Sequence, residues 1–129
     1  MPVFDSAEAR RLLDATFGVA DYAVTVAAPK LRLATATGSD TAAGTEVTNS
    51  GGSTYAAQDC PFSAASGRSI QNSGTVSFTN MPAATVSHVD IYDQANTTRK
   101  AYGALTTART TALGDTLSFA PGSIVVAYS

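Results

Sequence analysis

The first part of the chain has its apolar residues at helical spacing. The segment "DSAEARRLLDATFG" predicts a helix of about three turns, which is marginal alone in water and must pack on its own sheet or on a neighbouring chain. Asp5 is suited to cap its first turn, with Glu8 three residues on at the spacing of a capping box. Gly18 is suited to end it. The apolar positions share one face: Ala9, Leu12, Leu13 and Phe17.

From Tyr22 onward the pattern changes to the alternation of strands. Leu31 and Leu33 alternate with Lys30 and Arg32, which predicts a strand with one solvated face. Alternation returns in several later segments: "TVSFTNM", "TVSHVDIYD", "AYGALTT", "TLSFA" and "SIVVAYS". The last of these predicts that Ile124, Val126 and Tyr128 share one face, opposite Val125 and Ala127.

Two segments rich in small polar residues separate these strands. Residues 38–58 predict a long loop with at most a short strand around Glu46-Val47, and a further strand is expected over Tyr55 to Phe62. Residues 63–74, "SAASGRSIQNSG", predict only turns.

Strands at this spacing predict a mainly β fold. We expect an antiparallel Ig-like or jelly-roll-like β-sandwich of about seven or eight short strands, with a short N-terminal α-helix. The predicted organisation is a helix or anchor segment over residues 1–20 and a single β-sandwich domain over residues 21–129.

Composition excludes several classes of protein. Charged residues make up only 14% of the 129 residues and the net charge is −2, which argues against a nucleic-acid binder. The basic pairs Arg10-Arg11 and Arg99-Lys100 are expected to be solvated. No apolar run is long enough for a membrane span, and the first residues are unlike a signal peptide, so we expect no membrane partner. Cys60, the single cysteine, is expected to be a small buried hydrophobe.

No set of residues predicts catalysis, a metal site or a cofactor. His88 and Asp90 share a strand face and could touch one ion, but zinc needs three or four ligands and Asp93 falls on the other face. The favoured interpretation of His88 and Asp90 is a polar row on a surface that faces solvent or a subunit. Asp40 and Glu46 are too few acidic groups for a calcium loop. We therefore predict a protein that is not an enzyme. The candidate site is instead a possible interface: Leu12, Leu13, Phe17, Tyr55 and Tyr92. Strand tyrosines are more often half-buried in sheet packing than exposed for a partner or a sugar.

Three segments, in this order, resemble one family. "GTEVTNSGGSTYAAQ" (44–58) resembles "GTEVSGGGYAR", and "VSHVDIYD" (86–93) resembles "VTHVAIFD". "YGALTTARTTALGDTLSFAPGSIVVAYS" (102–129) resembles "GALTTSKTVNSGDTLSFAAGALTV", with GDTLSFAPG its most specific part. The family is that of small tailed-phage virion proteins, often labelled as tail fibre or minor structural proteins.

The resemblance implies a non-enzymatic virion protein, made in the host cytoplasm and placed on the surface of the head or on the tail. The favoured expectation is a head decoration protein that binds and stabilises the major capsid shell, because the chain lacks the long repetitive shaft of a fibre. The alternative is a tail or collar fibre, or a receptor- or glycan-binding module. The expected partners are the major capsid protein or other virion proteins, and further copies of the chain in a homo-oligomer.

Overall fold

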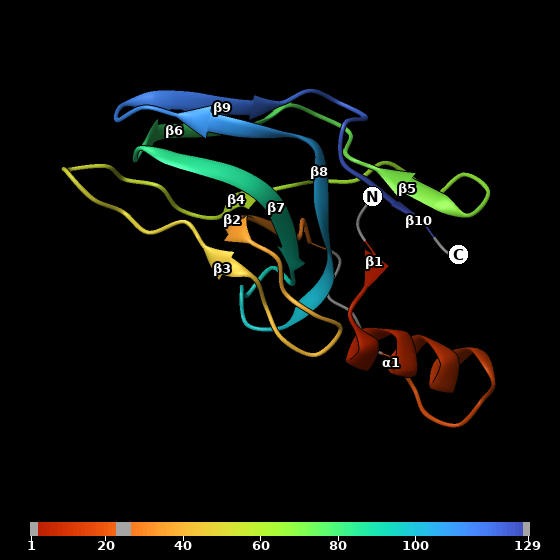
Figure 1. Ribbon diagram of the computed structural model, residues 1–129. Coiled ribbons are helices and arrows are strands. Elements are labelled where there is room, and N and C mark those ends of the chain that lie inside the picture. The colour runs from red at the N-terminus through yellow and green to blue at the C-terminus, as the bar shows by residue number, and fades with distance from the viewer. Residues whose placement is uncertain (1–2, 23–26, 128–129) are drawn as a thin grey trace.

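The chain folds mainly into antiparallel strands, as predicted from its alternation (Figure 1). The computed structural model describes residues 3–22 and 27–127, and within them it contains ten strands and one helix. The elements in chain order are β1 (Val3–Phe4), α1 (Ser6–Thr16), β2 (Lys30–Ala36), β3 (Thr45–Glu46), β4 (Gln58–Asp59), β5 (Ser69–Gln71), β6 (Val76–Met81), β7 (Ala84–Tyr92), β8 (Arg99–Thr111), β9 (Asp115–Phe119) and β10 (Val125–Ala127).

The largest sheet has the strand order β1-β8-β7-β2-β3, and β4 also pairs with β2. Two smaller sheets consist of β5 with β10 and of β6 with β9. Every pairing is antiparallel. Ile91 of β7 lies opposite Leu31 on one side and Ala101 on the other, so β7 is an inner strand of the large sheet.

One hydrophobic core joins the three sheets. Leu31, Leu33 and Val89 of the large sheet belong to the same buried cluster as Phe78 of β6 and Val126 of β10. The aromatic rings contribute specific geometry, because Phe78 stacks with Tyr55 at 5.9 Å and meets Phe119 edge-on at 6.1 Å. The predicted mainly β antiparallel fold is confirmed.

Two predicted segments differ from the structure. The strand expected over Tyr55 to Phe62 is reduced to β4. Its ladder with β2 ends where the Cys60 N–H donates to the carbonyl of Pro29, because Pro29 has no N–H to donate in return. The segment expected to form only turns contains β5, which exists because it pairs with β10. Local turn propensity is overridden there by a distant partner strand. The predicted position of Tyr128 lies outside the described residues.

Strand β8 is longer than predicted, and its pairing with β7 is interrupted by a large bulge. Between the pairs Val86 with Arg109 and His88 with Ala104, β7 has one residue, whereas β8 has four, residues 105–108. A bulge bends a strand and increases its twist. Figure 1 shows the result: β8 runs alongside β7 and then turns toward β6 and β9.

Candidate attachment surface

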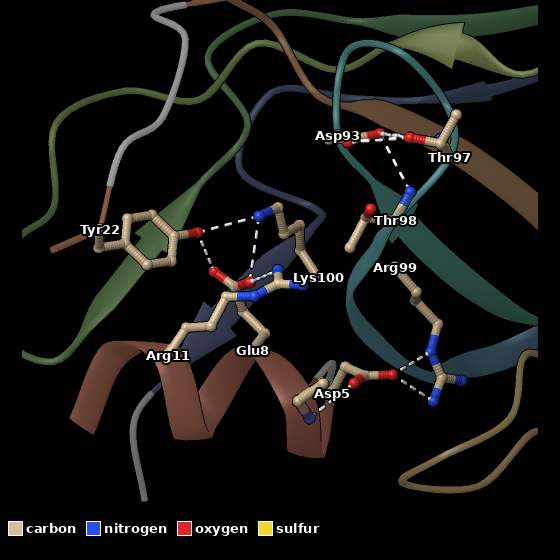
Figure 2. A network of polar contacts seen from close by, with 10 residues as sticks. Asp5, Glu8, Arg11, Tyr22, Asp93, Thr97, Thr98, Arg99 and Lys100 are labelled. Carbon is tan, nitrogen blue, oxygen red and sulfur yellow. Dashed lines mark hydrogen bonds and ion pairs between the residues drawn. The ribbon is translucent and has the colours of Figure 1, made fainter. Parts of the chain in front are cut away.

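The helix meets the large sheet at a second bulge in β8. Ile91 pairs with Ala101 and Tyr92 pairs with Arg99, which leaves Lys100 as an extra residue. Neighbouring strand residues normally point to opposite faces, and a bulge re-aims one of them. Both basic side chains therefore reach the start of α1 (Figure 2).

Arg99 ties the helix N-cap to the loop between β2 and β3. Its Nε donates to Oδ2 of Asp5 at 2.9 Å. Its Nη1 donates to the carbonyl of Ala42 at 2.7 Å, and its Nη2 donates to the carbonyl of Ser39. The expectation that the pair Arg99-Lys100 is solvated is therefore wrong for Arg99, whose side chain is buried. Its burial is tolerated because acceptors surround the guanidinium.

Asp90 lies against the same guanidinium, with Oδ1 3.8 Å from Nη1 of Arg99. Its Oδ2 accepts a hydrogen bond from the Gly44 N–H at 3.1 Å. Burial raises the pKa of Asp90, although this hydrogen bond and the charges of Arg99 and Arg32 act in the opposite direction. The predicted polar surface row of His88 and Asp90 is therefore wrong for Asp90, because the β2–β3 loop covers β7 at this point.

Glu8 is the second attachment point of the helix and is only 3% exposed. Its carboxylate accepts from Lys100 Nζ at 3.0 Å, from Arg11 Nη1 at 3.2 Å and from the Tyr22 hydroxyl (Figure 2). The predicted capping box is therefore wrong. The Asp5 N–H, which Glu8 would bind in such a box, donates to the Lys100 carbonyl instead. Asp5 does cap the helix as predicted, because its side chain accepts from the second helical N–H.

Charge in this cluster is set by the surrounding hydrogen bonds. Burial lowers the pKa of Lys100, but its hydrogen bonds to Tyr22 and Glu8 and the carboxylate charge outweigh burial, so the pKa is raised overall. Burial, followed by the bond to Glu8, raises the pKa of the Tyr22 hydroxyl. At neutral pH, Lys100 is therefore a cation and Tyr22 a neutral hydrogen-bond donor.

The turn between β7 and β8 is ordered by Asp93. Its Oδ1 accepts from the backbone N–H groups of Thr97 at 2.9 Å and Thr98 at 3.2 Å (Figure 2). These bonds, with that of Thr97 the larger effect, lower the pKa of Asp93. The carboxylate considered as a third metal ligand thus holds the turn that leads into Arg99.

The apolar side of the helix end remains at the surface, because α1 is attached through charged side chains. Leu13, Phe17 and Val19, here named the helix tip, are 58%, 76% and 74% exposed. Gly18 ends the helix as predicted, with φ of +74°. The Val19 N–H donates to the Asp14 carbonyl, and the Gly18 N–H to that of Ala15, which is a Schellman motif. The tip is thus held in place by backbone hydrogen bonds.

The predicted interface residues separate into two groups. Leu13 and Phe17 lie in the helix tip, and Leu12 is half-buried. Tyr55 and Tyr92 are buried within the chain, so their rings face no partner surface.

Each buried tyrosine has an internal role. The Tyr55 hydroxyl accepts from the Leu33 N–H at 3.0 Å and donates to Glu46 at 2.8 Å, and burial raises its pKa. The ring of Tyr92 lies 3.7 Å from the Arg32 guanidinium.

The remaining chemical candidates are dispersed. His88 Nδ1 lies 2.7 Å from the hydroxyl of Ser87. Cys60 is buried, as predicted, and burial raises its pKa to about 11. Among the described residues, no three His, Cys, Asp or Glu side chains come together in a way that could hold a metal ion. In the same part of the chain, no helix is both long and apolar enough to cross a bilayer.

The charged pairs that hold the helix were missed by the sequence reasoning. Asp5 and Arg99 are 94 residues apart, and Glu8 and Lys100 are 92 apart. The available signal was an acidic pair at the start of the helix together with an adjacent basic pair before a strand. Nothing in the spacing shows that the two pairs meet.

Comparison with known protein families places this chain. Residues 4–127 match the family described as podophage GP4 fiber I protein gp80. No curated protein matches the chain significantly. The family match includes the helix and confirms the resemblance to phage virion structural proteins. It agrees with the tail fibre alternative and not with head decoration. The chain is a member of the podophage GP4 fiber I protein gp80 family.

Proposed function

We propose that this chain is a non-enzymatic structural subunit of a phage fibre and that it joins its neighbours through the helix tip. The observation that carries the proposal is the exposure of three large apolar side chains on a chain that belongs to a fibre family. Exposed apolar patches mark interaction sites in soluble proteins. Phe17, with 76% of its surface exposed, is the principal contact residue of this proposal.

The polar interior supports a structural role. Among the described residues, every buried side-chain nitrogen and oxygen has a hydrogen-bond partner. Catalytic sites keep their titratable groups open to a substrate. Here the buried carboxylates of Glu8 and Asp90 are occupied by basic side chains or backbone N–H groups. The tyrosines Tyr55 and Tyr92 are buried, so neither ring is open to stack on a sugar.

The way α1 is attached fits assembly. A helix that packed its leucine face on its own sheet would have no apolar surface left for a partner. Glu8 and Asp5 hold the helix by ion pairs, which leaves Leu13 and Phe17 available to another virion protein or to a second copy. Such contacts stabilise an assembled particle, since they form only when the partner is present.

Electron microscopy of purified virions tests this proposal. Gold-labelled antibodies raised against the purified chain should bind along fibres, and virions treated with the gold conjugate alone provide the control. Quantitative mass spectrometry should give a copy number far below that of the major capsid protein. Gold distributed evenly over the head, with a copy number in a simple ratio to the capsid subunit, would refute the fibre assignment.

A further inference from the structure

An apolar groove lies where β1 meets the β5–β10 pair. Figure 1 shows these three strands side by side. Its volume is about 260 Å³, and its lining includes Phe4, Ala65, Arg68, Ile70 and Val126. An apolar cavity of about 150 Å³ is large enough to hold benzene, so this groove has room for a phenylalanine ring.

The chain does not fill the groove with its own helix tip. No residue of α1 lines the groove, and Phe17 is 76% exposed. The tip and the groove are therefore two separate apolar surfaces of one chain.

The charges beside the two surfaces have opposite signs. Arg68 lines the groove, is exposed, and makes no ion pair within residues 3–22 and 27–127. At the helix tip, Asp14 follows Leu13 in the chain and Asp21 lies two residues after Val19. Neither carboxylate makes an ion pair within those ranges. The last turn of α1 has no basic residue to offset the negative end of the helix dipole. The positive charge of Arg68 at the groove therefore complements the carboxylates of Asp14 and Asp21 and the negative end of the helix dipole.

We propose that the helix tip of one copy seats in this groove of a second copy. Phe17 enters among Phe4, Ile70 and Val126, and Arg68 of the second copy faces Asp14 and the end of the helix. The occupant is a second copy because the chain itself carries both halves of the match in shape, polarity and charge. This inference rests on the proposed fibre function, which requires subunits that bind one another.

The proposed contact is heterologous, since it joins two different surfaces. Each copy then offers one tip and one groove, so copies add head to tail and form either a closed ring or an open row. A contact between two helix tips would instead stop at a dimer.

Cross-linking of mixed cysteine variants tests the contact. Ala20→Cys, beside the helix tip, and Ala65→Cys are both at exposed positions and leave Phe17 in place, and one variant carries a tag that makes its mass distinct. Cys60 does not interfere, because it is buried and its pKa is raised to about 11. With a short bismaleimide, the mixture should give the mixed dimer, and each variant alone should give much less. Thr116→Cys on β9, mixed with Ala20→Cys, is the matched control.

Two results would overturn the proposal. One is a mixed dimer yield no higher than that of the Thr116 control. The other is a dominant Ala20→Cys homodimer, which would mean that tips bind tips.

Sedimentation velocity provides a second, independent readout. Phe17→Ser should weaken self-association about 10- to 100-fold, because it removes the main side chain that the proposed contact buries. The core of the single chain is left intact, since Phe17 is exposed there. Arg68→Glu and Asp14→Arg should each weaken it a few fold, and the two changes in the same chain should restore it. If the doubly changed chain associates no better than either single variant, Arg68 and Asp14 do not face each other and the proposed seating is wrong.

The virion experiment and the cross-linking experiment test different proposals, so a negative result in one does not decide the other. Fibre labelling without a mixed cross-link would remove the groove contact and leave the fibre function standing. A mixed cross-link with labelling away from fibres would keep the contact and remove the function.

Discussion

Arg99→Met should be among the most destabilising single changes in this chain. The substitution keeps most of the side-chain length but removes the guanidinium that holds Asp5, Asp90 and two backbone carbonyls. The carboxylate of Asp5 would then be left beside the sheet without its cation. Removing one partner of a buried ion pair costs about 3–5 kcal/mol of the free energy of unfolding. For a domain of this size, that corresponds to a fall in Tm of about 10–20 °C.

Urea unfolding followed by circular dichroism measures this loss. The midpoint should fall while the slope with urea stays constant, since the variant still folds to the same core. Arg10→Met is the matched control, because Arg10 is exposed and makes no ion pair with the described residues. It should change stability by no more than about 0.5 kcal/mol. Equal losses for the two variants would refute the idea that the Arg99 contacts hold the fold together.

Combining the change with Asp5→Asn identifies the partner. If Arg99 acts through Asp5, the double variant should lose clearly less than the sum of the single losses, by at least about 1 kcal/mol. Strictly additive losses would mean that Asp90 and the carbonyls of Ser39 and Ala42, rather than Asp5, account for the effect.

Three further predictions follow from other buried or ordered groups. Tyr55→Phe should cost about 1–3 kcal/mol in urea unfolding, because it leaves the buried Leu33 N–H without its acceptor; a loss below about 0.5 kcal/mol would contradict this. Cys60 should react with a thiol reagent at about pH 8 only after unfolding, since it is buried and its pKa is about 11; rapid reaction of the native chain would show an open core. Asp93 has a lowered pKa, so the stability it contributes is present above its unfolded pKa of about 3.9 and is lost as the pH falls toward its folded value. The difference in free energy of unfolding between the native chain and Asp93→Asn should therefore narrow between about pH 6 and pH 2, and a constant difference would show that ionised Asp93 does not hold the turn.

The strands that carry an amphipathic alternation were predictable from sequence. Leu31 and Leu33 face the core as their alternation requires, and so do Leu117 and Phe119. Gly18 ends the helix where a residue with positive φ is needed. In these cases, a local pattern and the tertiary structure favour the same conformation.

The candidate site was less predictable, because its contacts depend on residues far apart in the chain. The helix pattern left open whether its apolar face packs on the sheet or on a neighbouring chain, and it gave no sign that Glu8 is the buried helix residue. The burial of Glu8 depends on Lys100, which the bulge in β8 turns toward the helix. Bulges follow from strand register, and register is decided by the whole sheet. Tyr55 and Tyr92 looked like interface residues because a tyrosine in a strand gives no sign of which face is covered.

The ion pairs at the start of α1 also determine how tension would pass through a fibre. The shorter covalent route from the helix into the sheet runs through β1, whose ladder with β8 pairs Val3 and Phe4 among the described residues. A pull on so short a ladder has few hydrogen bonds to break. Two ion pairs connect the helix directly to β8: Asp5 with Arg99, and Glu8 with Lys100. They transmit force on the helix to β8, which is itself hydrogen-bonded to β7 on both sides of its large bulge. Because Arg99 is buried, dissolved ions screen its ion pair with Asp5 only weakly. This connection should therefore persist at both low and high ionic strength.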